Sequence, residues 1–210
     1  QAYHIEAMEN GLRVVAPTSP VLSRGDTLNR PTITIEFLAV SPEVISVRAW
    51  HYEGYRTGEA RFEKKETTCD AVVTITENEA VLDAGRVSVH VDRKNWGYSF
   101  WADGKLLTSS GFHNLGYVRW DKRVSSMLPQ DNYMKEHEYT PYMTQDLLLA
   151  PGENVYGFGE RFTAFVKNGQ AVETWNEDGG TASQVAYKNI PFYMTNSCLL
   201  YTSDAADDGE

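Results

Sequence analysis

The stretch "TITIEFLAV", residues 32–40, decides the fold class of this chain. Every second residue from Ile33 to Ala39 is apolar, with Ile35 and Phe37 between them, whereas Thr34 and Glu36 are polar. A β-strand turns successive side chains to opposite faces, so this period of two predicts a strand that buries one face.

The same period returns along the chain, in "VISVRAW" (44–50), "AVVTITE" (71–77) and "RVSVHVD" (86–92). In "SFWADGKLLTSS" (99–110), the dipeptide Asp103-Gly104 joins two such runs and predicts a hairpin. No amphipathic helix interrupts the pattern. Many short strands separated by turns predict an all-β fold, an antiparallel β-sandwich. We expect any break between parts at 125–139, which can equally be a loop between sheets.

Composition excludes several classes of partner. The formal net charge is −10, which disfavours binding to nucleic-acid phosphates, because that needs a basic surface. No apolar stretch approaches the roughly 20 residues of a membrane helix, and no signal peptide pattern opens the chain. With only two cysteines in the sequence, we predict a cytoplasmic protein without a disulfide framework.

The strand pattern collapses after "IPFYMTN" (190–196), where "SCLLYTSDAADDGE" follows. A polar, frayed C-terminus is one interpretation. The letters also resemble the translation of a transposon end used in preparing DNA sequencing libraries. We therefore expect residues 197–210 to be a non-native tail from adaptor read-through.

One family of domains ends in sequence motifs that resemble three segments of this chain, in the same order and close together. These segments are "YGFGERF" (156–162), "WNEDGG" (175–180) and "AYKNIPFYMTN" (186–196). That family is the N-terminal β-sandwich of glycoside hydrolase family 31, closest to its α-xylosidase branch. The resemblance implies that residues 1–196 form a galactose-mutarotase-like supersandwich. In the parent protein a (β/α)8 barrel would follow.

The resemblance also implies an activity for that parent: retaining, exo-acting hydrolysis of terminal α-linked xylose or glucose from oligosaccharides. Such enzymes use two carboxylates about 5–5.5 Å apart, one as nucleophile and one as acid. In the family both catalytic aspartates belong to the barrel, and no residue here matches either motif. We expect this chain to have no catalytic residue, to be inactive alone, and to need no cofactor. The five histidines show no zinc spacing, so no metal site is expected.

The matching segments contain a predicted substrate-binding set. Asp178 matches the family position whose carboxylate reaches sugar hydroxyls, and an ionised acceptor makes stronger hydrogen bonds than a neutral one. Trp175 offers an apolar face to a sugar ring, and Asn176 and Glu177 complete the set. The competing interpretation is structural: Asp178 caps a turn at the two following glycines, and Trp175 belongs to the core.

The rest of this segment has predicted supporting roles. Gly157 and Gly159 would allow close approach of two backbones. Glu160 and Arg161 would pair with the barrel, and Lys167 and Asn168 would lie at the tip of a loop that closes the sugar pocket.

Other functions compete with a barrel enzyme's domain. One is a stand-alone carbohydrate-binding β-sandwich module. Another is a mutarotase-like enzyme, but it requires a His/Glu constellation that we cannot assemble from this sequence. The sequence is compatible with either xylose or glucose as the sugar released, and with a homo-oligomeric parent.

Overall fold

A computed structural model describes residues 2–28, 31–51, 69–121, 139–174, 186–197 and 200–202. The chain divides into two compact units, Gln1–Leu148 and Leu149–Glu210. Each unit is built from antiparallel strands.

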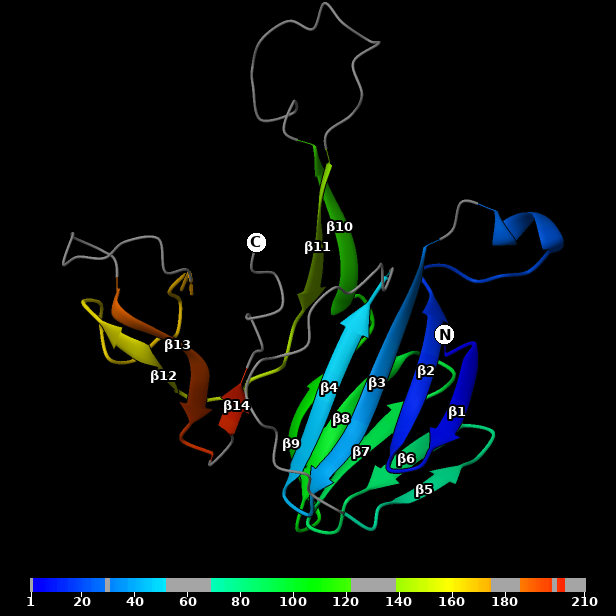
Figure 1. The fold of residues 1–210 in the computed structure, drawn as a ribbon, viewed down its shortest axis with the longest axis horizontal. Coiled ribbons are helices and arrows are strands. Elements are labelled where there is room, and N and C mark those ends of the chain that lie inside the picture. Colours follow the sequence, from blue (N-terminus) through cyan, green and yellow to red (C-terminus); the bar gives the residue numbers. More distant parts are fainter. Residues whose placement is uncertain are drawn as a thin grey trace, which may run out of the picture. The chain divides into compact units, whose positions relative to one another are not determined.

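The first unit contains two large sheets, each with its strands in chain order (Figure 1). The first sheet consists of β1 (His4–Met8), β2 (Gly11–Pro17), β3 (Thr32–Ser41) and β4 (Val44–Trp50). The second consists of β5 (Val72–Ile75), β6 (Glu79–Asp83), β7 (Val87–Asp92), β8 (Gly97–Ala102) and β9 (Lys105–Ser110). All neighbouring strands in both sheets run antiparallel.

The core lies between these two sheets and is built on β3. Its alternating residues Ile33, Ile35, Phe37 and Ala39 are all buried, as the period of two predicts. From the second sheet, residues of β6, β7 and β8 join the same cluster, and the Phe37 ring meets the Tyr98 ring edge-on at 5.2 Å. The predicted all-β antiparallel sandwich is confirmed.

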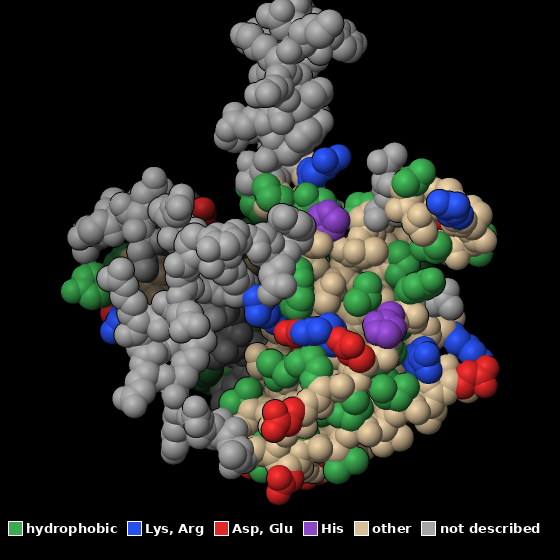
Figure 2. All heavy atoms as spheres, turned by 45° about the vertical axis from the view of Figure 1, so that its right-hand side comes forward, with side chains coloured by type: hydrophobic (Ala, Val, Ile, Leu, Met, Phe, Trp, Pro, Cys, Tyr) green, Lys and Arg blue, Asp and Glu red, His purple; other side chains and the backbone are tan. Residues whose placement is uncertain are grey.

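Charged side chains hold the outer side of the first sheet together. Arg13 on β2 lies between Glu6 on β1 and Glu36 on β3, with N–O distances of 2.8 and 2.6 Å. Hydrogen bonds to Glu36 and then Glu6 raise the pKa of the Arg13 guanidinium. On the side of the molecule seen in Figure 2, acidic and basic side chains lie interspersed rather than in a field of one sign.

The predicted hairpin turn is confirmed, because Asp103 and Gly104 take φ values of 50° and 72° between β8 and β9. Positive φ at both central residues matches the twist of paired strands.

After β9, the chain forms a separate two-stranded antiparallel sheet of β10 (Leu115–Asp121) and β11 (Tyr139–Gln145). The stretch 125–139 therefore connects paired strands and ends where β11 begins; most of it lies outside the described residues. The two compact units divide instead at Leu148 and Leu149.

The second unit contains β12 (Val155–Arg161), β13 (Ala186–Thr195) and β14 (Leu200–Thr202), paired antiparallel in that order. The predicted strand in "IPFYMTN" is the second half of β13. Three residues of the segment expected to be a tail thus form β14 beside Phe192–Met194. The origin of that segment stays a prediction.

Helical structure is scarce in the described part of the chain. It consists of one 3-10 turn, η1 (Arg24–Thr27). Across the same residues, no helix has the length and apolar character that crossing a bilayer requires.

We predict that Phe37→Ala will lower the free energy of unfolding of the first unit by about 3–5 kcal/mol, because it removes a fully buried ring and leaves a cavity. Urea denaturation measures the loss. Leu22→Ala serves as the control, since Leu22 is 88% exposed and its replacement should change stability by at most about 0.5 kcal/mol. Equal losses in the two variants would contradict the assigned core.

Candidate functional site

The candidate site is the hairpin of β12 and β13 with the long connection 162–185 between them. The strands pair from Val155 opposite Thr195 to Arg161 opposite Ala186. The four residues of the predicted substrate-binding set, Trp175, Asn176, Glu177 and Asp178, lie outside the described residues. The structure describes both arms that lead to them, residues 162–174 and the start of β13.

A bulge shapes β12 where "YGFGERF" predicted a close approach of backbones. Gly157 and Gly159 have φ values of 113° and 83°, and the pairing register shifts between them. A Cβ at Gly157 would lie 2.7 Å from the carbonyl oxygen of Phe192, and one at Gly159 would overlap the carbonyl oxygen of Lys188. The prediction for these two glycines is confirmed, since no other residue fits there without moving β13.

Phe158, between the two glycines, also has a positive φ of 66°. A non-glycine residue in this region costs on the order of 1–3 kcal/mol, which the surroundings must offset. Two contacts do so: the Phe158 ring stacks on Tyr193 of β13 at 5.2 Å, and its carbonyl accepts a 2.9 Å hydrogen bond from Arg161 Nε. The bulge is therefore held from both sides.

Arg161 fastens the two arms of the connection to each other. Its guanidinium donates to the backbone carbonyl of Glu173 at 2.5 Å and to the side-chain oxygen of Asn189 on β13. Burial lowers the pKa of this guanidinium, although an arginine stays charged at any physiological pH. Within the hairpin, Arg161 Nε and Nη2 are thus engaged by Phe158, Glu173 and Asn189. The pairing of Arg161 with a barrel stays a prediction.

The first arm folds back on β12, so the prediction that Lys167 and Asn168 form a loop tip is wrong. Lys167 is only 7% exposed, and its ammonium donates to Thr163 Oγ1 at 2.9 Å and to the Ala164 carbonyl at 2.7 Å. Asn168 accepts from the Val155 amide at 2.8 Å and donates to the Glu153 carbonyl at 2.9 Å. Both side chains satisfy backbone groups that a free tip would leave to water.

Glu153 is a further buried group that the sequence did not single out. Its carboxylate accepts a 2.7 Å hydrogen bond from the Ala150 amide and closes the turn before β12. Burial, and secondly the charge of Glu153, raise the pKa of the Tyr193 phenol on β13. In the sequence, Glu153 is marked only by its position after the Pro151-Gly152 turn, and a glutamate at such a turn is common on protein surfaces.

Large apolar side chains around the connection face outward. Phe165 is 78% and Tyr187 69% exposed, and Phe162 and Ile190 are exposed as well. Their exposure leaves apolar surface open to solvent on the second unit.

Comparison with known proteins identifies this architecture. The fold class is an antiparallel β-sandwich, and a β-hairpin with a long connection follows it in the chain. A family model described as the glycosyl hydrolase 31 N-terminal galactose mutarotase-like domain matches residues 33–201. The chain therefore belongs to this family.

Two curated relatives are α-xylosidases. XylQ of Lactiplantibacillus pentosus is 37% identical over 91% of this chain, and an α-xylosidase of Emericella nidulans is 34% identical over 83%. The chain spans only 24% and 23% of their respective lengths. Among solved structures, the GH31 dextranase of Flavobacterium johnsoniae, complexed with glucose, superposes with a TM-score of 0.61 at 17% identity. That match covers 92% of this chain and 21% of the dextranase, and at this identity it shows the fold alone.

We predict that Gly159→Ala will disrupt the hairpin, whereas Gly152→Ala will not. Both glycines have φ near +80°, so each alanine costs about 1–2 kcal/mol in backbone strain. Only at Gly159 does the new methyl group also overlap β13, since nothing lies within 4 Å of a Cβ at Gly152.

Amide hydrogen exchange of β12 and β13 measures the difference between these variants. Protection should fall strongly in Gly159→Ala and persist in Gly152→Ala. Equal protection in both would show that close approach of the two strands does not shape the bulge.

Proposed function

We propose that this chain is the N-terminal domain of a retaining, exo-acting α-glycosidase that releases terminal α-linked xylose or glucose from oligosaccharides. The carrying observation is the 37% identity to an α-xylosidase across 91% of the chain. Both curated relatives are named α-xylosidases, and this favours xylose over glucose as the sugar released. The dextranase match, at 17% identity, carries no weight for the substrate.

The role proposed for the chain within that enzyme is to supply one wall of the sugar pocket. A (β/α)8 barrel builds its pocket from loops at the C-terminal ends of its strands. An exo-acting pocket also needs a wall that closes its far side, and we assign this wall to the connection 162–185. Its support is the firm base of the hairpin, where Arg161 bonds to Glu173 and Asn189 on either side of residues 175–185.

Within the wall, Asp178 is assigned as the acceptor of hydrogen bonds from sugar hydroxyls, with Asn176 and Glu177 beside it and Trp175 against a ring face. An ionised carboxylate accepts stronger hydrogen bonds than a neutral group. The reacting carboxylates themselves belong, on this proposal, to the barrel of the longer protein. The exposed rings of Phe162 and Phe165 are the surface offered to that barrel.

The proposal includes a cytoplasmic location. Cys69, the one cysteine among the described residues, is a buried thiol that donates to the Ala84 carbonyl at 3.4 Å. A buried thiol of this kind packs as a small apolar side chain and needs no oxidising compartment.

We predict that Asp178→Ala in the full-length enzyme will lower kcat/KM by about 1–3 kcal/mol, or roughly 5- to 150-fold, because a sugar hydroxyl loses its charged acceptor. Steady-state kinetics on an α-xylosyl oligosaccharide measure the effect. Asp70→Ala, at an exposed position of the first unit, is the matched control and should keep the parent rate. An unchanged kcat/KM in Asp178→Ala would remove this residue from the pocket.

We also predict that the chain of residues 1–210 will not hydrolyse p-nitrophenyl α-xyloside, whereas the full-length enzyme will release α-xylose with retained configuration. Absorbance of nitrophenolate and the anomeric proton signals of the first product measure the two properties. Hydrolysis at an enzyme-like rate by this chain alone would overturn the proposal, because it would place the reacting carboxylates here.

A further inference from the structure

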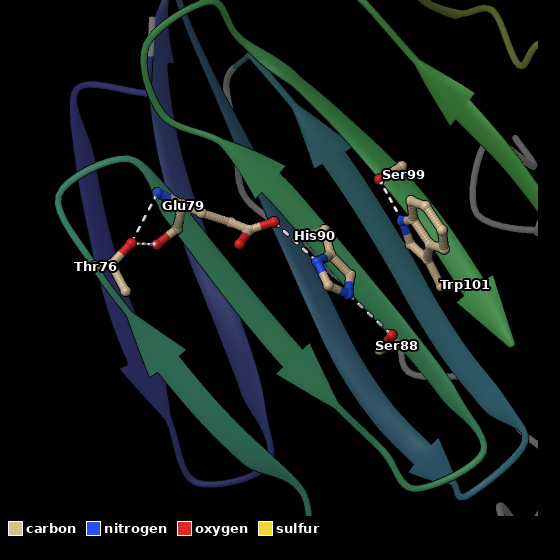
Figure 3. A network of polar contacts seen from close by, with 6 residues as sticks. All are labelled: Thr76, Glu79, Ser88, His90, Ser99 and Trp101. Atoms are coloured by element: carbon tan, nitrogen blue, oxygen red, sulfur yellow. Dashed lines mark hydrogen bonds and ion pairs between the residues drawn. The ribbon is translucent and has the colours of Figure 1, made fainter. Parts of the chain in front are cut away.

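A second surface of interest lies on the first unit, on the side of the second sheet that faces away from the core. Val89 and Val91 of β7 point into the core, so Ser88 and His90, which alternate with them along the strand, point outward. By register, Ser99 lies opposite His90, and Trp101 lies opposite Ser88. Figure 3 shows these outward side chains, with Glu79 of β6, on one face of the sheet. We call Glu79, Ser88, His90, Ser99 and Trp101 the outer-face row.

Hydrogen bonds fix the histidine of this row. His90 Nδ1 lies 2.9 Å from Glu79 Oε1, and His90 Nε2 lies 3.2 Å from the Ser88 hydroxyl (Figure 3). A neutral imidazole donates through Nδ1 to the carboxylate, and its Nε2 then accepts from the serine. Glu79 is anchored in turn, because its amide donates to Thr76 Oγ1 at 3.1 Å.

The tryptophan of the row is held in the same way. Its indole N–H donates to Ser99 Oγ at 2.8 Å, and its ring lies 5.7 Å from the His90 ring, tilted by 53°. The Trp101 side chain is half-buried, so part of the indole stays open to solvent. An aromatic surface that is already fixed loses little entropy when a ligand packs on it.

A polar pocket adjoins this row through Glu79. It has a volume of about 340 Å³ and is lined by Asn78, Glu79, Asp92, Lys94 and Asn95. It is an open depression of the surface rather than an enclosed cavity, and its volume has room for one sugar ring.

One wall of the pocket is rigid and charged. Asp92 accepts from the amides of Lys94 and Asn95 at 2.8 and 3.0 Å, and from the Asn95 side chain at 3.2 Å. These hydrogen bonds, that from the Asn95 amide foremost, lower the pKa of Asp92 and keep it ionised at neutral pH.

The chemistry of this surface selects among ligands. Two carboxylates against one ammonium group disfavour an anionic ligand. An apolar ligand would strand the carboxylates and amides without partners, at a cost in free energy. Sugar hydroxyls donate to carboxylates and accept from amide and ammonium groups, while the C–H face of a sugar ring packs on an indole.

We propose that the outer-face row and the adjoining pocket bind a neutral oligosaccharide, one sugar ring in the pocket and the next toward Trp101. This site goes beyond the proposed function, because it needs neither the connection 162–185 nor a barrel. It serves to hold a glycan chain on the domain rather than to cleave it.

Titration of the chain of residues 1–210 tests this site by nuclear magnetic resonance. The probes are maltotriose and the disaccharide xylosyl-α-1,6-glucose, with glucuronic acid as the anionic control. Amide shifts are expected at 78–79, 88–95 and 99–101 with the neutral sugars, and no shifts with glucuronic acid. No shifts at millimolar sugar, or shifts confined to the second unit, would overturn the proposal. Either result would leave the hydrolase assignment intact.

Variants separate the contributions to this binding. Trp101→Ala should weaken the affinity about tenfold, the scale of one aromatic contact. Glu79→Gln keeps the backbone bonds to Thr76 and should weaken it too, because the charged acceptor is gone. Tyr3→Ala removes a 65% exposed aromatic next to β1 of the first sheet and should bind as the parent does. If Trp101→Ala fails to fold, Glu79→Gln decides: parent affinity in that variant would overturn the site.

Discussion

Each large sheet of the first unit has one apolar face, and neither face is stable in water. The face of β3 that carries Ile35 and Phe37 meets the face of β7 that carries Val89 and Val91, and these side chains are fully buried. Burial of apolar area is the main favourable term in folding, and the entropy of the ordered chain opposes it. Everything on the outside of the sandwich depends on this contact, because it decides which residue of each strand points outward.

One consequence is that the outward residues are free to be chemically diverse. On the first sheet they form an ion-pair row across three strands, Glu6, Arg13 and Glu36. On the second sheet they form the row with Glu79, His90 and Trp101. A sheet aligns such residues at fixed spacing, since directly opposite side chains lie about 4.5–5.5 Å apart at Cβ. The sandwich thus serves as a rigid support for polar groups that no single strand could arrange.

The second unit uses a different device. Its hairpin has few buried apolar residues, so its shape depends on backbone conformation and on hydrogen bonds from side chains. Three consecutive positive φ values at residues 157–159 change the direction of β12. Arg161 then bonds both to Glu173 in the long connection and to Asn189 on β13. A connection as long as 162–185 needs such a base, because ordering a long loop costs conformational entropy.

The sequence by itself determined the strands of the sandwich, the Asp103-Gly104 turn and the family, because each of these depends on neighbours in the chain. Period two is local, positive φ at an Asp-Gly turn is local, and the segments "YGFGERF" and "AYKNIPFYMTN" are contiguous. The close approach at Gly157 and Gly159 was predictable for the same reason, since two glycines in a strand have few other uses.

Only the tertiary structure decided which partners the polar side chains take. Asn168 was predicted to lie at a loop tip, but its side chain binds the Val155 amide and the Glu153 carbonyl, at and before the start of β12. Arg161 reaches Asn189, and His90 reaches Glu79, across strand pairs whose register depends on the whole fold. Hydrogen bonds act over about 3 Å in space at any separation in sequence, so no local pattern specifies them.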